Sequence, residues 1–331
     1  MASHFSAAAL RGAVARACGQ PAGGDHEPVK LQHKSGTGAR LAMPLHAIAL
    51  GLFIHTLWGG NAVAVKWSLE AFPPLWVGFV RFVIGTAAVG AYALLLRVRL
   101  WPYPGEWRAF AVLMLVFVFQ IWTMNVGFGA TTGSLSTILL SLNPLFGALL
   151  ARFFLSAEHL SPMRIAGMCV AFAGTAAALS PESNSGLREF MNPGNWIVIG
   201  SAVLLGARLM YSARLVRESG ELRTMFWMMA LSLPLFLAGA AATETIQWSH
   251  LGWRPVAGLA YQGVVIAGFC FVANSFLLRK YSPSVVVSFN FVSPIAGVAL
   301  SILLLDESFT AGVALGLVLV AAGLTLVTRS R

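Results

Sequence analysis

The chain has 331 residues, of which 57% are hydrophobic and only 10% are charged, and its formal net charge is +10. Soluble globular proteins are about 45–50% apolar and about 25% charged. The composition therefore excludes a soluble single domain, and it excludes disorder over most of the length. The 3 cysteines, Cys18, Cys169 and Cys270, share no close spacing, so the sequence indicates neither a disulfide framework nor a zinc site.

The N-terminal segment differs from the rest of the chain. It is basic and rich in small residues, and it has no apolar run long enough to cross a membrane. We predict a disordered basic tail over residues 1–44. Two alternatives stay open. The segment could target an organelle, since no acidic residue precedes Asp25, or translation could begin at Met43, just before the first apolar run.

Ten apolar runs follow the tail, and a helix that crosses the hydrocarbon core needs roughly 20 apolar residues. Backbone polar groups cannot stay unpaired in lipid, and the runs are continuous rather than alternating, which favours helices over a closed barrel. The predicted spans are Leu45–Val65, Pro74–Leu96, Ala109–Phe128, Thr132–Leu155, Ile165–Leu179, Trp196–Ala213, Thr224–Ala242, Val256–Leu278, Ser284–Leu305 and Ala311–Thr328. The sequence thus predicts an all-α polytopic membrane protein with ten transmembrane helices.

The distribution of basic residues predicts the orientation. If the N-terminus is cytoplasmic, the tails and cytoplasmic loops hold most of the Lys and Arg residues, and only Lys66, Arg188 and Arg254 lie on the opposite side. This is the positive-inside bias of membrane proteins. We therefore expect a multi-pass protein of the plasma or inner membrane with both termini in the cytoplasm. The same bias explains the basic charge without any nucleic-acid partner.

An internal repeat divides the chain into halves. Asn143-Pro144-Leu145-Phe146-Gly147 matches Ser293-Pro294-Ile295-Ala296-Gly297. Each match is followed by the same residues in the same order, with one residue of slippage: Glu158, Gly167 and Gly174 in the first half, and Glu307, Gly316 and Gly323 in the second. The repeat assigns residues 45–180 to a first unit and 196–328 to a second, with a connecting loop over 181–195 and a short cytoplasmic tail over 329–331.

Each unit holds five predicted spans. Because five is odd, the second unit enters the membrane in the opposite direction, which makes an inverted-topology repeat. Two similar halves of this kind can exchange conformations and so open alternately to each side of the membrane. The alternative is an old duplication that is retained only for packing.

Several short motifs accompany the repeat. They are Trp58-Gly59-Gly60-Asn61 with Lys66 in the first span, Pro73-Pro74 after it, Arg81-Phe82 in the second span, and the two Pro…Gly…Glu…Gly…Gly signatures. With these residues the chain resembles the ten-span EamA-type branch of the drug/metabolite transporter superfamily, from about Leu45 to Thr328. The resemblance implies a membrane carrier for small organic metabolites, and it does not fix the substrate. The halves differ at Asn143 and Ser293, and Arg152 interrupts only the fourth span.

Charged residues inside spans are the first candidates for function. A charge within a span is costly unless it meets a partner or a water-filled cavity. We predict that Arg81 binds a substrate carboxylate or forms a gate ion pair, with snorkelling to the interface as the alternative. Lys66 is expected to anchor at the interface, and Arg152 and Arg208 to snorkel to lipid phosphates.

His55 is the other ionisable group deep in a span. Because histidine titrates near neutral pH, it could carry a proton in a coupled cycle, and a packed, hydrogen-bonded histidine is the alternative. No Asp or Glu lies inside any predicted span. This absence disfavours proton antiport through a membrane carboxylate.

Two prolines are expected to interrupt helices near mid-depth. Pro144 and Pro294 each remove a backbone hydrogen bond and bend the helix, and the freed carbonyl then needs a polar partner. We predict that these breaks, with Asn143 and Asn290 beside them, line a central cavity, with packing kinks as the alternative. A pocket for an amphipathic organic molecule would also use polar and aromatic side chains at span depth: Trp58, Asn61 and Trp122.

Glu158 and Glu307 follow the fourth and ninth spans, on opposite sides of the membrane. Each precedes a helix start, where a carboxylate interacts favourably with the helix dipole. We expect each to cap the helix that follows it, and a gate ion pair is the alternative.

Together these features predict a secondary transporter that moves a small organic metabolite by alternating access. Amino acids or their derivatives are the suggested solutes, and the family resemblance favours export. A channel and a structural or receptor role are the alternatives, whereas enzymes are disfavoured because nucleotide-binding and hydrolase motifs are missing from the sequence. We expect no cofactor and no metal. The expected partners are the metabolite and the bilayer, with monomer or dimer left open.

Overall fold

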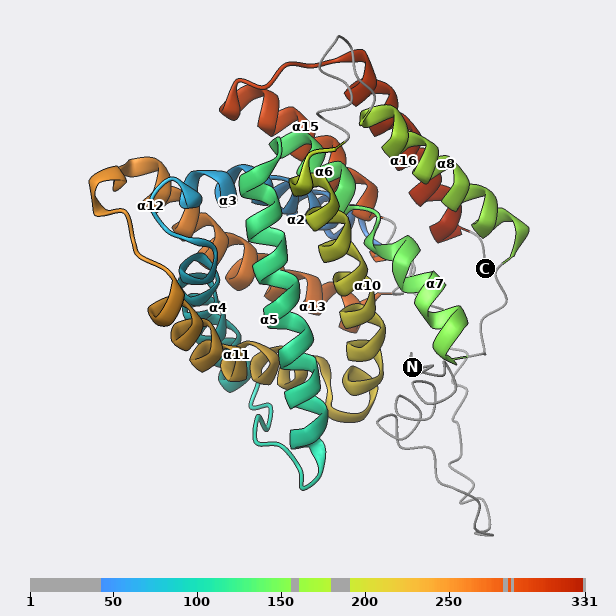
Figure 1. The fold of residues 1–331 in the computed structure, drawn as a ribbon. Helices are drawn as coiled ribbons and strands as arrows, with labels where there is room; N and C mark the ends of the chain where they lie inside the picture. The colour runs from blue at the N-terminus through green and yellow to red at the C-terminus, as the bar shows by residue number, and fades with distance from the viewer. Residues whose placement is uncertain (1–42, 156–160, 180–190, 282–284, 287–288, 330–331) are drawn as a thin grey trace, which may run out of the picture.

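The computed structural model describes residues 43–155, 161–179, 191–281, 285–286 and 289–329, and these contain no strand (Figure 1). The helices of the first half are α2 (Leu45–Gly59), α3 (Asn61–Leu69), α4 (Pro74–Leu95), α5 (Glu106–Ala130), α6 (Gly133–Leu140), α7 (Asn143–Leu155) and α8 (Pro162–Ala178). Those of the second half are α10 (Pro193–Ser219), α11 (Glu221–Thr243), η1 (Trp248–His250), α12 (Trp253–Ala260), η2 (Tyr261–Cys270), α13 (Phe271–Lys280), η3 (Phe289–Phe291), α15 (Val292–Leu305) and α16 (Ala311–Arg329).

Ten helical stretches correspond to the ten predicted spans. Within the described residues, 7 are long and apolar enough to cross a bilayer, and shorter apolar helices cover Pro162–Ala178, Phe289–Leu305 and Ala311–Val327. The prediction of an all-α polytopic membrane protein is confirmed. The ends differ from the prediction, since the first span continues through Lys66 to Leu69 and the third begins at Glu106.

Several spans change their helical geometry part-way. The first is interrupted at Gly60, between α2 and α3, and the fourth is interrupted between Leu140 and Asn143, directly before Pro144. The ninth passes from the 3₁₀ turn η3 into α15, and Pro294 lies in the first turn of that helix, where its missing N–H is tolerated. In the eighth span, η2 is a π-helix of 10 residues, which the sequence did not predict. Such wide turns are rare and frequently occur at functional sites.

The fifth and tenth spans show that the two halves are inverted. Helices α8 and α16 lie side by side (Figure 1). A Cβ on Gly167 would lie 2.8 Å from the carbonyl oxygen of Gly323, and one on Gly174 would lie 2.9 Å from that of Gly316. The helices are therefore antiparallel. The repeat equates Gly167 with Gly316 and Gly174 with Gly323, so each contact is the counterpart of the other under a two-fold axis, which confirms the inverted repeat.

A second pair of contacts obeys the same relation. The first span crosses the ninth where Gly59 meets Gly297, and a Cβ on Gly59 would lie 2.7 Å from the backbone nitrogen of Gly297. The sixth span crosses the fourth where Gly206 meets Gly147, and a Cβ on Gly206 would lie 2.6 Å from the backbone nitrogen of Gly147. Only residues without a side chain allow backbones to approach this closely in a membrane bundle. The fourth span therefore packs against the sixth, which begins the second half. The ninth span packs against the first, which begins the first half.

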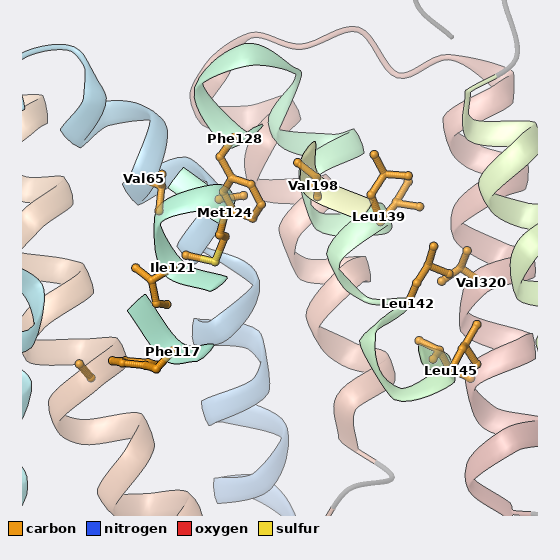
Figure 2. Close-up of a cluster of buried hydrophobic side chains, with 14 of the residues drawn as sticks. Val65, Phe117, Ile121, Met124, Phe128, Leu139, Leu142, Leu145, Val198 and Val320 are labelled. Carbon is orange, nitrogen blue, oxygen red and sulfur yellow. The ribbon is translucent and has the colours of Figure 1, made fainter. Parts of the chain in front are cut away.

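The buried core also crosses the boundary between the halves. In Figure 2, Val65 of α3 and Phe117, Ile121, Met124 and Phe128 of α5 belong to one cluster with Leu139, Leu142 and Leu145 of the fourth span, Val198 of α10 and Val320 of α16. The two halves therefore pack as one body, and a site between them is enclosed by both.

Candidate solute-binding site

Arg81 projects from α4 into the bundle and is only 5% exposed. Its Nη1 atom donates a long hydrogen bond of 3.4 Å to the Gln262 side-chain oxygen, and its Nε atom is buried without a partner. The guanidinium carbon lies 5.2 Å from the Phe82 ring centroid. None of the described carboxylates forms an ion pair with it. The structure thus places a buried cation with an unused donor where the sequence predicted a substrate contact.

Arg208 is a second such cation, although the sequence predicted that it snorkels to lipid phosphates. It projects from α10 in the other half, its Nε atom is also buried without a partner, and its guanidinium carbon lies 5.0 Å from the Phe117 centroid. The ring centroids of Phe117 and Phe82 are 4.6 Å apart, so each cation lies against one member of a pair of neighbouring aromatic rings. The positive charge of Arg208 repels the positive charge of Arg81. The expectation that Arg208 snorkels outwards is wrong, because its side chain turns onto a fully buried ring.

Gln262 of the π-helix accepts the hydrogen bond from Arg81. Its side-chain nitrogen donates to the hydroxyl of Ser68 at 2.8 Å and to the carbonyl of Ala64 at 3.2 Å. Both donor positions are occupied, so the amide oxygen is directed at Arg81. The widened turns of η2 hold this fully buried side chain against the first span, which belongs to the other half.

Three of the predicted residues meet where the first span contacts the ninth. The His55 ring nitrogens lie 2.8 Å from the Gly51 carbonyl and 2.8 Å from the Asn290 side-chain oxygen. The Trp58 ring meets the His55 ring edge-on at 5.0 Å, and Ser293 donates to the His55 carbonyl. His55, Trp58 and Asn290 thus form one cluster, and it combines residues from both halves.

The other predicted binding residues are more scattered. Asn61 begins α3, and its side-chain oxygen is buried without a partner. Asn143 donates to the Leu140 carbonyl and so serves the interrupted helix, while its own carbonyl faces Gly206, two residues before Arg208. Trp122 is 39% exposed and lies on an outward stripe of α5 with Phe119, apart from both clusters.

Comparison with known proteins identifies the chain. The sequence model of the EamA-like transporter family matches residues 45–180 and again 192–329. The chain belongs to the EamA-like transporter family. The two matches cover the two inverted halves, so the duplication seen in the structure is a duplication of the family's unit. This assignment makes the protein a multi-pass membrane transporter.

Relatives and a solved structure agree with the assignment. The chain is 25% identical to "Uncharacterized inner membrane transporter YedA" of Escherichia coli (strain K12), over 79% of this chain and 83% of that protein. It is 23% identical to "Probable amino-acid metabolite efflux pump" of the same organism, over 83% and 92%. One solved structure, named only "Crystal structure of protein", matches with a TM-score of 0.63 at 20% identity, over 85% of this chain and 96% of that one, which supports the fold alone.

At one end of the bundle the two halves are joined by polar contacts. Glu307 accepts hydrogen bonds from the backbone nitrogens of Gly133 and Ser134 and from the Ser134 hydroxyl. The expectation that Glu307 caps its following helix is wrong, because it caps α6 while Thr310 caps α16. Glu158, its counterpart in the repeat, lies outside the described residues.

Lys66 belongs to the same end of the bundle. Its ammonium donates to the carbonyls of Thr131 at 2.6 Å and Phe128 at 3.2 Å, which are left free at the C-terminal end of α5. A lysine in this position also complements the negative end of the helix dipole. Lys66 is therefore a helix cap, and it is electrostatically attracted to Glu307. Among the described residues, no cluster of three metal-ligating side chains exists.

Proposed function

We propose that the protein is a secondary carrier of the plasma or inner membrane that moves a small organic metabolite by alternating access. The observation that carries the proposal is the reciprocal packing of α8 and α16, in which two glycine contacts are related by the inverted repeat. Halves related in this way have two equivalent ways to pack, one open to each side, which is how inverted-repeat transporters work.

The candidate binding groups fit a carrier of this kind. Arg81 comes from the first half and Arg208 and Gln262 from the second, so a solute bound among them would contact both halves. Movement of one half against the other would then change the shape of the site. The predicted breaks beside Pro144 and Pro294 lie in the two spans that cross into the opposite half, where a change of helix direction has the largest effect on packing.

Orientation and direction are part of the same proposal. The excess of Lys and Arg in alternate loops supports cytoplasmic termini, and Glu307 then lies at the outer end. An inner-membrane location is supported by the name of one relative, and export of an amino acid or a derivative by the name of another.

The test is counterflow into liposomes that contain the purified protein. The liposomes are loaded with an unlabelled bacterial metabolite extract and placed in the same extract with uniform ¹³C labelling. A carrier predicts that at least one labelled mass accumulates, that its uptake saturates, and that loading accelerates it. Flux that neither saturates nor responds to loading would indicate a channel, and no flux beyond that of protein-free liposomes would refute transport.

A further inference from the structure

We propose that Arg81 and Arg208 together bind a small organic dianion, such as a dicarboxylate, and that this is the class of solute that the carrier moves. The proposal rests on the carrier function above and adds the charge of the solute. It goes beyond the sequence prediction, in which Arg81 alone was expected to bind a carboxylate.

The first step is that the described part of the chain supplies no counter-ion for these two cations. The described chain contains seven acidic side chains, and each has another place. Glu70 and Asp306 are exposed at helix ends, Glu218 pairs with Arg214, and the other four bind serine hydroxyls or helix N-termini: Glu106, Glu221, Glu244 and Glu307. Two positive charges within the bundle therefore remain without a negative partner from these residues.

The second step is that both arginines keep a donor unused. The Nε atom of each has no exposed surface and no hydrogen-bond partner. A buried guanidinium is normally satisfied, because an unmade hydrogen bond of a charged group is costly. The cation–π contacts with Phe82 and Phe117 stabilise the two charges but supply no hydrogen-bond acceptor for the Nε atoms. Carboxylates match such edges geometrically.

The third step concerns the number of charges. A neutral solute leaves both cations uncompensated, and a monoanion leaves one. A dianion compensates both cations. The two arginines and the bound solute then carry no net charge inside the membrane, where an uncompensated charge raises the free energy. One arginine belongs to α4 and the other to α10, so the two carboxylates of one solute would connect the two halves.

The transport test uses the counterflow assay with four variants. Arg81→Gln and Arg208→Gln remove one cation each, and Arg81→Lys keeps the charge but loses the planar fork. Arg254→Gln is the matched control, because Arg254 is an exposed cation that also lies over tryptophan rings. Labelled solutes that accumulate with the wild-type protein should be dianions. Either glutamine variant should raise their KM at least tenfold or abolish their uptake, whereas Arg254→Gln should leave it unchanged.

A second measurement needs no variant that has to fold. Succinate and glutarate at millimolar concentration should raise the melting temperature of the detergent-solubilised wild-type protein, because a ligand that binds only the folded state stabilises it. The neutral isostere succinamide should not. Equal shifts with succinate and succinamide, or no shift with either dianion, would overturn the paired site.

The outcomes separate the two proposals. Saturable exchange of neutral or cationic solutes alone, unchanged in Arg81→Gln and Arg208→Gln, would refute the dianion site and leave the carrier function standing. If no labelled solute exchanges at all, the carrier function fails, and the thermal comparison still decides whether the arginine pair binds dianions.

Discussion

Glu307→Gln is expected to weaken the closure at one end of the transporter. The wild-type carboxylate accepts from two backbone nitrogens at the start of α6 and from the Ser134 hydroxyl. Glutamine has nearly the same shape, but only one of its two terminal atoms can accept a hydrogen bond. The variant therefore loses the charge and at least one of the three bonds, while the side-chain volume stays the same.

The magnitude follows from these contacts. A hydrogen bond to a charged group contributes about 1.5–3 kcal/mol, and a charge in a partly buried position at a helix terminus contributes up to about 2 kcal/mol. These contributions overlap, and at least one weaker bond survives, so we expect a loss of about 2 kcal/mol from the closed state. Since about 1.4 kcal/mol is a factor of ten in an equilibrium constant, the ratio of open to closed protein should rise roughly 30-fold.

A buried reporter beneath the cap can measure this ratio. Ser301 is fully buried, and a Cβ on Gly133 would lie 2.6 Å from its hydroxyl oxygen. In a variant without native cysteines, Ser301→Cys should react slowly with a membrane-impermeant maleimide, and adding Glu307→Gln should accelerate the reaction by roughly the same factor. Glu70→Gln is the control, because Glu70 is an exposed acid near the same end. An unchanged rate in correctly folded Glu307→Gln protein would show that the cap does not hold this end closed.

Two further substitutions test the packing between the halves. Gly316→Val should lower the stability by about 1–3 kcal/mol through overpacking, because its Cβ would lie 2.7 Å from the Gly174 carbonyl oxygen, whereas Gly200→Val has open space. Thermal unfolding in detergent checks this, and equal melting temperatures would contradict it. Asn290→Ala should cost about 1–3 kcal/mol by leaving the Nε2 atom of His55 without its partner. The loss should shrink in a His55→Ala background, and strictly additive losses in unfolding titrations would refute the coupling.

The spans could be predicted from sequence because the bilayer imposes length and apolarity on any helix that crosses it. The ends could not, because they depend on local polar contacts. Lys66 was expected to end the first span at the interface, but it remains inside α3, where it reaches the free carbonyls of α5. The π-helix was also missed. The segment Tyr261–Cys270 is as apolar as an ordinary span, so its composition does not distinguish a π-helix from an α-helix.

The repeat predicted which glycines are equivalent but not what they touch. Gly167 and Gly316 could be paired by their distance from a glutamate, whereas the contact of each with a glycine of the opposite half required coordinates. The same limit applies to the arginines. The sequence places Arg208 within the sixth span, but it does not show what its side chain contacts. Arg81 could be singled out because it lies well inside its predicted span, whereas Arg208 lies near the cytoplasmic end of its own.

For the alternating access proposed above, the contacts between the halves divide into two kinds. The glycine contacts of α8 with α16, and of the first span with the ninth, are backbone packing within the apolar region. Lipid cannot replace them without leaving a gap, so they favour a fixed axis. The contacts of Glu307 with α6, and of Glu106 with Ser219 and Arg223, lie at the two ends of the bundle. Water can replace these at a net cost of about 0.5–1.5 kcal/mol for each ordinary hydrogen bond, and more for the charged ones. A rocking motion that keeps the glycine contacts and exchanges the polar ones for water is therefore the movement that we expect, and it would change the packing around Arg81 and Arg208.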